Sequence, residues 1–161
     1  MSTTLRERAL PAADHPFLAF LNSVGEDGKT RTQSLYSTGA ELWELLVASG
    51  VQLPQDAARQ VELAPLLDFR EAAYGVLSAC AAQRTPSRED MLVVEASLKH
   101  AVADAHVQMR ADGLAINAHS MGGLLDNMAL QFLDLTTGPE FPRLRECRRC
   151  TKLFIDHGRG R

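Results

Sequence analysis

The sequence predicts a mainly α-helical domain with one small β-hairpin and a cysteine-bearing C-terminal appendage. Stretches with apolar residues three and four positions apart predict the helices. An Asp-Gly dipeptide between two short alternating segments predicts the hairpin. A Cys-x-x-Cys pair, Cys147 and Cys150, marks the appendage. With 161 residues, 45% of them hydrophobic, the chain is long enough for one globular domain and a small additional unit.

Two helices are expected in the first half of the chain. Thr38 and Glu41 have capping-box spacing ahead of an apolar run, and Gly50 stands where that helix would stop. A longer helix is expected over residues 64–82, because apolar side chains recur there at steps of three and four. Its inner face consists of Leu66, Phe69, Ala73, Leu77 and Cys80. The position of Cys80 on that face favours a core residue over a reactive thiol.

A third helix and the hairpin follow. Ser87 and Asp90 form another capping signal, and the expected inner face of this helix is Met91, Val94, Leu98 and Ala101. The period then changes, since residues 107–117 alternate between apolar and polar on each side of Asp112-Gly113. This pattern is typical of a tight hairpin.

A final helix is expected over residues 121–135 and closes at Gly138-Pro139. Its inner face is Met121, Leu125, Met128, Phe132 and Leu135. Residues 118–123 resemble the Gly-x-Ser-x-Gly elbow of serine hydrolases, but the first glycine is Ala118 and the chain lacks the repeated strand and helix units of a parallel sheet. Ser120 is therefore predicted to cap the helix and not to act as a nucleophile.

Other patterns that would indicate an enzyme are also weak. The histidines, including His119, show no spacing with carboxylates that suits a metal, so surface or capping roles are expected for them. The segment from Gly25 to Gly28 lacks the Lys-Ser/Thr of a phosphate loop and carries acidic residues instead. We expect no enzymatic activity.

Charge separates the last nineteen residues from the rest of the chain. Residues 143–161 hold seven Lys or Arg and two acidic residues, a balance of +5. Residues 1–142 hold ten basic and eighteen acidic residues, a balance of -8, and the two balances give the net charge of -3. An acidic body with a basic, cysteine-bearing end indicates a regulatory domain with an appendage that faces nucleic acid. A solvated terminus is the alternative for any basic tail.

The remaining composition favours a cytoplasmic protein. No run approaches the roughly 20 apolar residues of a membrane span, and Met1 to Arg8 are not followed by an apolar signal segment. Three cysteines do not make a disulfide framework, which suits a reducing compartment.

The cysteine pair supplies half of a zinc site. Two thiolates two residues apart can share one tetrahedral zinc ion, but a structural site needs four ligands. The sequence holds no second Cys-x-x-Cys pair.

The order of several segments resembles a known bacterial family. The segments are Phe17 to Ser23, Leu42 to Leu46, Leu67 to Tyr74, and Arg143-Leu-Arg145-x-Cys147-x-x-Cys150-x-x-Leu153-Phe154-Ile155-Asp156. They resemble the ABATE domain followed by the opening of a CGNR-type zinc finger, a family described as putative stress-induced transcription regulators. The resemblance divides the chain into a helical ABATE-like domain (1–142) and a partial finger (143–161), which is the first half of a zinc-ribbon-like finger.

The resemblance implies a helical sensor or dimerisation domain coupled to a DNA-binding finger. Zinc would be held by Cys147 and Cys150, which match the first two family ligands. The groups expected to contact DNA are Arg148, Arg149, Lys152, Arg159 and Arg161. The second cysteine pair of the family is not found in these 161 residues. Either further chain supplies it, or His157 and a second molecule complete the metal shell.

Two polar residues beside apolar runs suggest a pocket for a small effector in the helical body. These are Asn22 and Arg70, for which partners within the fold are the alternative. A second hypothesis for the whole chain is a small-molecule-binding or protein-interaction domain whose degenerate finger does not engage DNA. A homodimer is the usual symmetry of such regulators.

Overall fold

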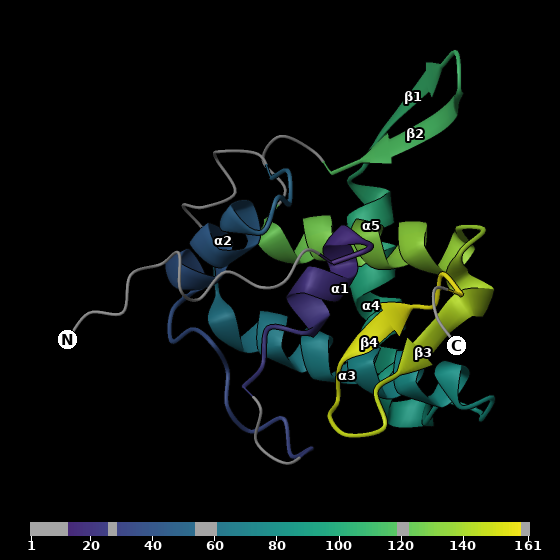
Figure 1. Cartoon of the computed structure of the whole chain (residues 1–161). Coiled ribbons are helices and arrows are strands. Elements are labelled where there is room, and N and C mark those ends of the chain that lie inside the picture. Colours follow the sequence, from purple (N-terminus) through teal and green to yellow (C-terminus); the bar gives the residue numbers. More distant parts are fainter. Residues whose placement is uncertain (1–12, 26–28, 54–60, 119–122, 159–161) are drawn as a thin grey trace.

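The structure of the chain is a computed structural model that describes residues 13–25, 29–53, 61–118 and 123–158. The described residues form helices α1 to α5 and two antiparallel strand pairs (Figure 1). Helices dominate, as the sequence predicts. Ser120, His119, Met121, Arg159, Arg161 and the segment 26–28 lie outside the described residues.

Helix α1 (Pro16–Leu21) lies in the middle of the core and was not predicted by periodicity. Its sequence, PFLAFL, is apolar on every side, so it has no amphipathic pattern. Pro16 occupies its first turn, and Nδ1 of His15 accepts a hydrogen bond from the Phe17 amide at 3.1 Å. The capping role expected for a histidine is therefore observed at His15.

Helix α2 (Gly39–Ala48) begins with the predicted cap. The hydroxyl of Thr38 accepts a hydrogen bond from the Glu41 amide at 3.2 Å. The Glu41 carboxylate accepts one from the Ser37 amide at 2.7 Å, one residue earlier than in an ideal capping box. Gly50 follows the helix with φ +84°, a left-handed conformation that glycine adopts without strain.

Helices α3 (Leu63–Ala81) and α4 (Arg88–Ala103) pack against each other. The predicted inner face of α3 is confirmed at Leu66, Phe69, Ala73 and Leu77, which are all buried. Cys80 is half-buried at the edge of the core, and burial raises the pKa of its thiol, which keeps the thiol protonated.

The start of α4 is confirmed, but its inner face is narrower than predicted. Ser87 accepts a hydrogen bond from the Asp90 amide at 3.0 Å. Val94 and Ala101 are buried, whereas Met91 is 41% exposed. The prediction for Met91 is wrong, because α4 lies at the surface and buries only a thin stripe of side chains.

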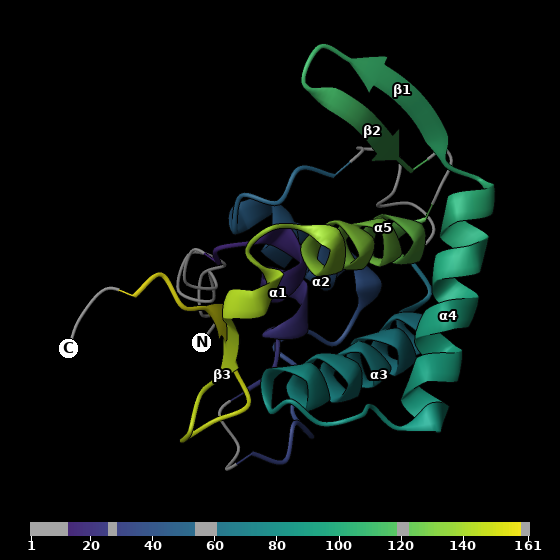
Figure 2. The same cartoon turned by 90° about the vertical axis from the view of Figure 1, so that its right-hand side faces the viewer.

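Strands β1 (His106–Arg110) and β2 (Gly113–Asn117) form the predicted hairpin. Their register pairs Val107 with Ile116 and Met109 with Leu114. The hairpin projects away from the helices (Figures 1 and 2).

Helix α5 (Leu124–Thr137) begins later than predicted. Its N-cap is Gly123, three residues after the predicted cap Ser120, which lies outside the described residues. Gly123 offers no side-chain oxygen for a cap, and its carbonyl accepts the first hydrogen bond of the helix, from the Asn127 amide at 3.2 Å. Gly138 ends the helix as expected. The buried inner face is Leu124, Met128, Phe132 and Leu135, with Leu125 half-buried beside it.

The core lies where α1, α3 and α5 meet. The rings of Phe17 and Phe132 pack edge to face with centroids 5.4 Å apart, and Phe17 meets Phe69 in the same way at 6.1 Å. The same core includes three residues beyond position 142, namely Leu144, Leu153 and Ile155. The C-terminal segment is thus packed on the helical body. None of the helices described is long and apolar enough to cross a membrane.

A histidine–carboxylate pair joins α4 to α5 and leads to a pH prediction. Nδ1 of His100 lies 2.8 Å from Oδ1 of Asp126, and this hydrogen bond raises the pKa of His100 above its usual value, with smaller contributions from the charges of Asp126 and Asp104. A raised folded pKa stabilises the fold below the unfolded value of about 6.5, and this gain is lost as the pH rises through the folded pKa.

Replacing His100 with glutamine should therefore lower the free energy of unfolding more at pH 5.5 than at pH 9. Because the ring is 73% exposed, the difference between the two pH values should not exceed about 0.5 kcal/mol. Urea unfolding at the two pH values measures it. An equal loss of unfolding free energy at both pH values would contradict a charged His100–Asp126 pair.

Candidate metal centre and nucleic-acid interface

The two cysteines of the C-terminal segment lie in the loop of a short hairpin. After the 3-10 turn η3 (Phe141–Arg143), strands β3 (Leu144–Glu146) and β4 (Leu153–Ile155) pair antiparallel. The Cys147 amide donates to the Lys152 carbonyl at 2.9 Å and closes the loop. Both thiols are free and half-buried.

The loop favours the thiolate form of Cys147. The amide of Arg149 points at the Cys147 sulfur, 3.4 Å away. This hydrogen bond lowers the pKa of Cys147, and contacts with Cys150 lower it further. Thiolate is the form that binds zinc, so this donor pair fits half of a tetrahedral site. Bound zinc would be held by Cys147 and Cys150 and would fix the loop that carries Arg148 and Arg149.

No third metal ligand accompanies the two sulfurs in the described part of the chain. His157 is directed elsewhere, because its Nε2 lies 3.2 Å from Asp14 and its Nδ1 lies 3.7 Å from Glu140. Within the described residues His157 therefore does not form one group with Cys147 and Cys150, and a metal shell completed by His157 and a second molecule stays a prediction. A carboxylate on each side of the imidazole explains its position.

The expected DNA-contacting residues differ in exposure. Arg148 and Arg149 are exposed in the loop between the cysteines. Lys152 is half-buried just before β4. The structure thus presents two adjacent cations beside the donor pair.

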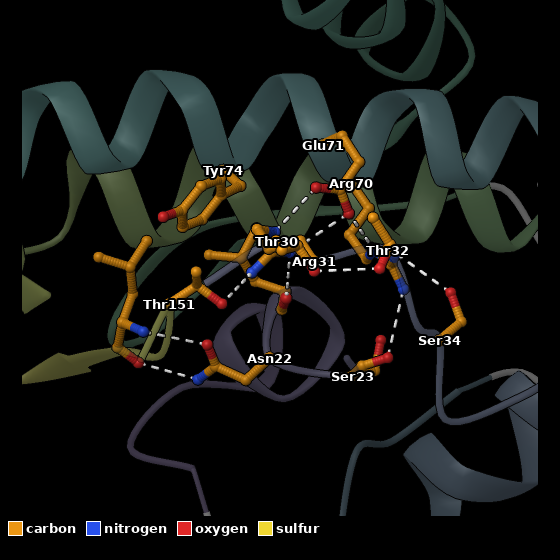
Figure 3. A network of polar contacts seen from close by, with 12 residues as sticks. Asn22, Ser23, Thr30, Arg31, Thr32, Ser34, Arg70, Glu71, Tyr74 and Thr151 are labelled. Carbon is orange, nitrogen blue, oxygen red and sulfur yellow. Dashed lines mark hydrogen bonds and ion pairs between the residues drawn. The ribbon is translucent and has the colours of Figure 1, made fainter. Parts of the chain in front are cut away.

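Asn22 holds strand β4 against the end of α1. Its Nδ2 donates to the Leu153 carbonyl at 2.9 Å, and the Leu153 amide donates to its Oδ1 at 3.0 Å (Figure 3). The side chain replaces a neighbouring strand in pairing with both main-chain groups of Leu153, which is itself 1% exposed. The polar atoms of Asn22 are therefore engaged by the fold.

Arg31 links the helical body to the cysteine loop. Its Nε donates to Glu71 on α3 at 2.8 Å, one terminal nitrogen donates to the Leu21 carbonyl at 2.8 Å, and the other lies 3.3 Å from the Thr151 hydroxyl (Figure 3). The guanidinium also covers the ring of Tyr74, 3.9 Å from its centroid. One buried side chain thus joins α1, α3 and the loop.

Arg70 belongs to the same network but lies further from the cysteines. Its Nε bonds to Glu71 at 2.7 Å, and its terminal nitrogens bond to the Ser23 carbonyl, the Tyr36 hydroxyl and the Ser34 hydroxyl. Only 2% of the residue is exposed. Glu71 therefore bridges two arginines, and Arg70 has a partner at each of its nitrogens.

Glu146 fastens the other strand to α3. Its carboxylate accepts hydrogen bonds from the Tyr74 hydroxyl at 2.8 Å and the Ser78 hydroxyl at 2.6 Å. Burial together with this hydrogen bond raises the pKa of Tyr74 to about 12. No local pattern points to Arg31 or Glu146, because the partners Glu71 and Thr151 of Arg31 lie 40 and 120 residues away and the partner Tyr74 of Glu146 lies 72 residues away.

A small cavity separates α1 from the cysteine loop. It has a volume of about 310 Å³. Its walls are mainly apolar and include Leu18, Ala19, Asn22, Cys147, Cys150 and Phe154. The predicted pocket residue Asn22 therefore lines a cavity with both cysteines, whereas Arg70 is not among the residues that line it.

Comparison with known families gives one match. The model of the ABATE family, described as a putative stress-induced transcription regulator, matches residues 14–139. The match runs from the cap of α1 to just past α5 and ends before the cysteine loop. No curated protein is similar enough to the chain to count as a match.

Proposed function

Because the chain belongs to the ABATE family of putative stress-induced transcription regulators, we propose that its helical body regulates a zinc-dependent DNA contact made by the C-terminal loop. The observation that carries the proposal is the loop itself. It places two half-buried thiols beside two exposed arginines and is fastened to α1 and α3 by Asn22, Arg31 and Glu146.

The chemistry of this loop suits the DNA backbone. Arginine side chains neutralise phosphates, and such contacts set affinity but not sequence preference. Arg148 and Arg149 lie on one short loop, and no described helix carries them into a groove. The 161 residues should therefore bind DNA weakly and with little sequence preference.

A salt titration tests this proposal. Binding of the zinc-loaded protein to a short duplex should weaken steeply with salt. Replacing both Arg148 and Arg149 with alanine should make the slope of log K against log salt shallower by about 2, since two phosphate contacts are lost. Fluorescence anisotropy between 25 and about 200 mM salt measures the slope.

The matched control removes two arginines outside the loop. Arg84 lies between α3 and α4, Arg88 begins α4, and both are exposed, so their replacement by alanine changes the net charge equally. An equal loss of slope in both double variants would point to general charge and not to the loop. Nanomolar, sequence-specific binding at physiological salt would contradict the weak contact.

The cavity beside the cysteines supports a second candidate function. A mainly apolar cavity of about 310 Å³ between α1 and the loop is at the lower end of the size of small-ligand sites. In this alternative the chain is a small-molecule-binding or protein-interaction domain whose finger does not engage DNA. Zinc bound without any salt-dependent DNA affinity would favour the alternative.

Binding of a small ligand in the cavity is also compatible with a DNA contact by the loop. An effector in the cavity would touch α1 and both cysteines, so it would act on the loop that carries the arginines. Its effect would then appear as a changed DNA affinity.

A further inference from the structure

The hairpin of β1 and β2 has one apolar face that is open to solvent. Val107, Met109, Leu114 and Ile116 are 62%, 78%, 59% and 38% exposed. Cross-strand pairing places Val107 opposite Ile116 and Met109 opposite Leu114. Since side chains alternate between the two faces of a strand, all four lie on the same face. We call them the hairpin face.

The opposite side of the hairpin carries mainly polar residues. It carries His106, Gln108, Arg110, Ala115 and Asn117. A hairpin with both sides in water would be expected to have polar residues on both. The hairpin face instead has the composition of a buried surface, in a two-stranded unit that is marginally stable by itself.

The hairpin face is also far from the cysteine loop. The hairpin projects from one end of the helical body, and β3 and β4 lie near the other (Figures 1 and 2). It holds no charged residue, so phosphates would find no partner on it. The face therefore fits an apolar protein surface and not nucleic acid.

We propose that the hairpin face is an interface between two copies of this chain, packed face to face about a two-fold axis. With the strands of the two hairpins antiparallel, the Val107–Ile116 pair of one copy lies on the Met109–Leu114 pair of the other. An aliphatic pair thus meets an aliphatic pair at each position, as an isologous contact requires. The two helical bodies then extend in opposite directions from the joined hairpins.

The size of the face sets the strength of this dimer. From the exposed fractions, the four side chains offer on the order of 400 Å² per copy, about half of the roughly 800 Å² per partner in a standard stable interface. The dimer is therefore weak, and it forms as the concentration rises. In the dimer Arg148 and Arg149 of both copies remain exposed, so both cysteine loops stay open to DNA.

Sedimentation of the full chain over a wide concentration range tests the interface. The mass of the wild type should rise from 17.6 kDa toward twice that value. Replacing Met109 with glutamate would bury like charges in the contact and should raise the dissociation constant at least tenfold. The matched control is Gln108→Glu, which adds the same charge to the opposite side of the same strand and should leave the dissociation constant within about twofold.

Because Met109 is largely exposed, its variant should melt at the wild-type temperature. Leu114→Lys, on the other strand of the face, answers the same question if Met109→Glu lowers the melting temperature. A wild type that stays at 17.6 kDa at the highest concentration, or face variants that associate as well as the wild type, would overturn the proposal. No DNA enters the experiment, so this failure would leave the proposed DNA contact standing.

Discussion

Replacing Arg70 with alanine should lower the free energy of unfolding by about 3 kcal/mol. The residue is 2% exposed and bonds to Glu71, Ser23, Tyr36 and Ser34. Removing it takes the guanidinium donor from the Tyr36 hydroxyl and the Ser23 carbonyl, which keep only longer hydrogen bonds, from the Ser23 hydroxyl at 3.5 Å and from the Leu35 amide at 3.3 Å. Glu71 keeps Arg31 as a partner and is 40% exposed, so the loss should lie at the low end of the range for a broken buried pair.

Urea unfolding of the variant and two controls measures this effect. Arg84→Ala removes an exposed arginine and should change stability by less than about 0.5 kcal/mol. Arg70→Lys keeps the charge but not the planar set of donors, so its loss should be intermediate. If Arg70→Ala were as stable as the wild type, the network would not need Arg70, and a role in ligand binding would become the better explanation.

The helices and the outer hairpin could be predicted because their signals are local. Thr38 and Ser87 cap helices from within three residues of their partners, and Asp112-Gly113 fixes a turn by itself. Helix α1 was missed because PFLAFL is apolar on all sides, although Pro16 at its first turn was an available signal. The cap of α5 was misplaced because a serine ahead of an apolar run is a common cap, and here Gly123 takes that place.

The site was only half predictable for a related reason. The Cys-x-x-Cys spacing is local, and the basic residues around it are visible in the composition. The contacts that fasten the loop join residues far apart, such as Asn22 with Leu153 and Arg31 with Thr151. A lone asparagine or arginine in a loop has many equivalent partners in a sequence, and only the packing of α1 against α3 selects one.

These contacts also bear on how a regulator of this family could work. The loop does not hang free from the helical body, because its two strands share the core and both are bonded to helices. A change in the position of α1 would therefore shift the loop that holds Cys147 and Cys150, because Asn22 and Arg31 connect the two. Packed and hydrogen-bonded groups can carry such coupling, and the network in Figure 3 joins the end of α1 to the cysteine loop through groups of this kind.

Replacing Asn22 with alanine should test that coupling and lower the free energy of unfolding by about 2 to 3 kcal/mol. The variant leaves both main-chain groups of Leu153 without their partner in a buried position. Hydrogen exchange at the amides of Leu153 and Cys147 should accelerate more than at amides in α3, because β4 loses its attachment to α1 while the helical core remains. Asn117→Ala, in the exposed outer hairpin, is the matched control and should leave this exchange unchanged.

Asn22→Asp separates the attachment from the loss of side-chain volume. It keeps the acceptor for the Leu153 amide but sets a carboxylate oxygen against the Leu153 carbonyl, so the two oxygens repel each other. Its exchange at Leu153 should therefore be at least as fast as that of the alanine variant. If both variants kept the wild-type exchange at Leu153, the loop would be held by Arg31 and Glu146 without Asn22, and a signal from α1 would have to reach the cysteines through Arg31.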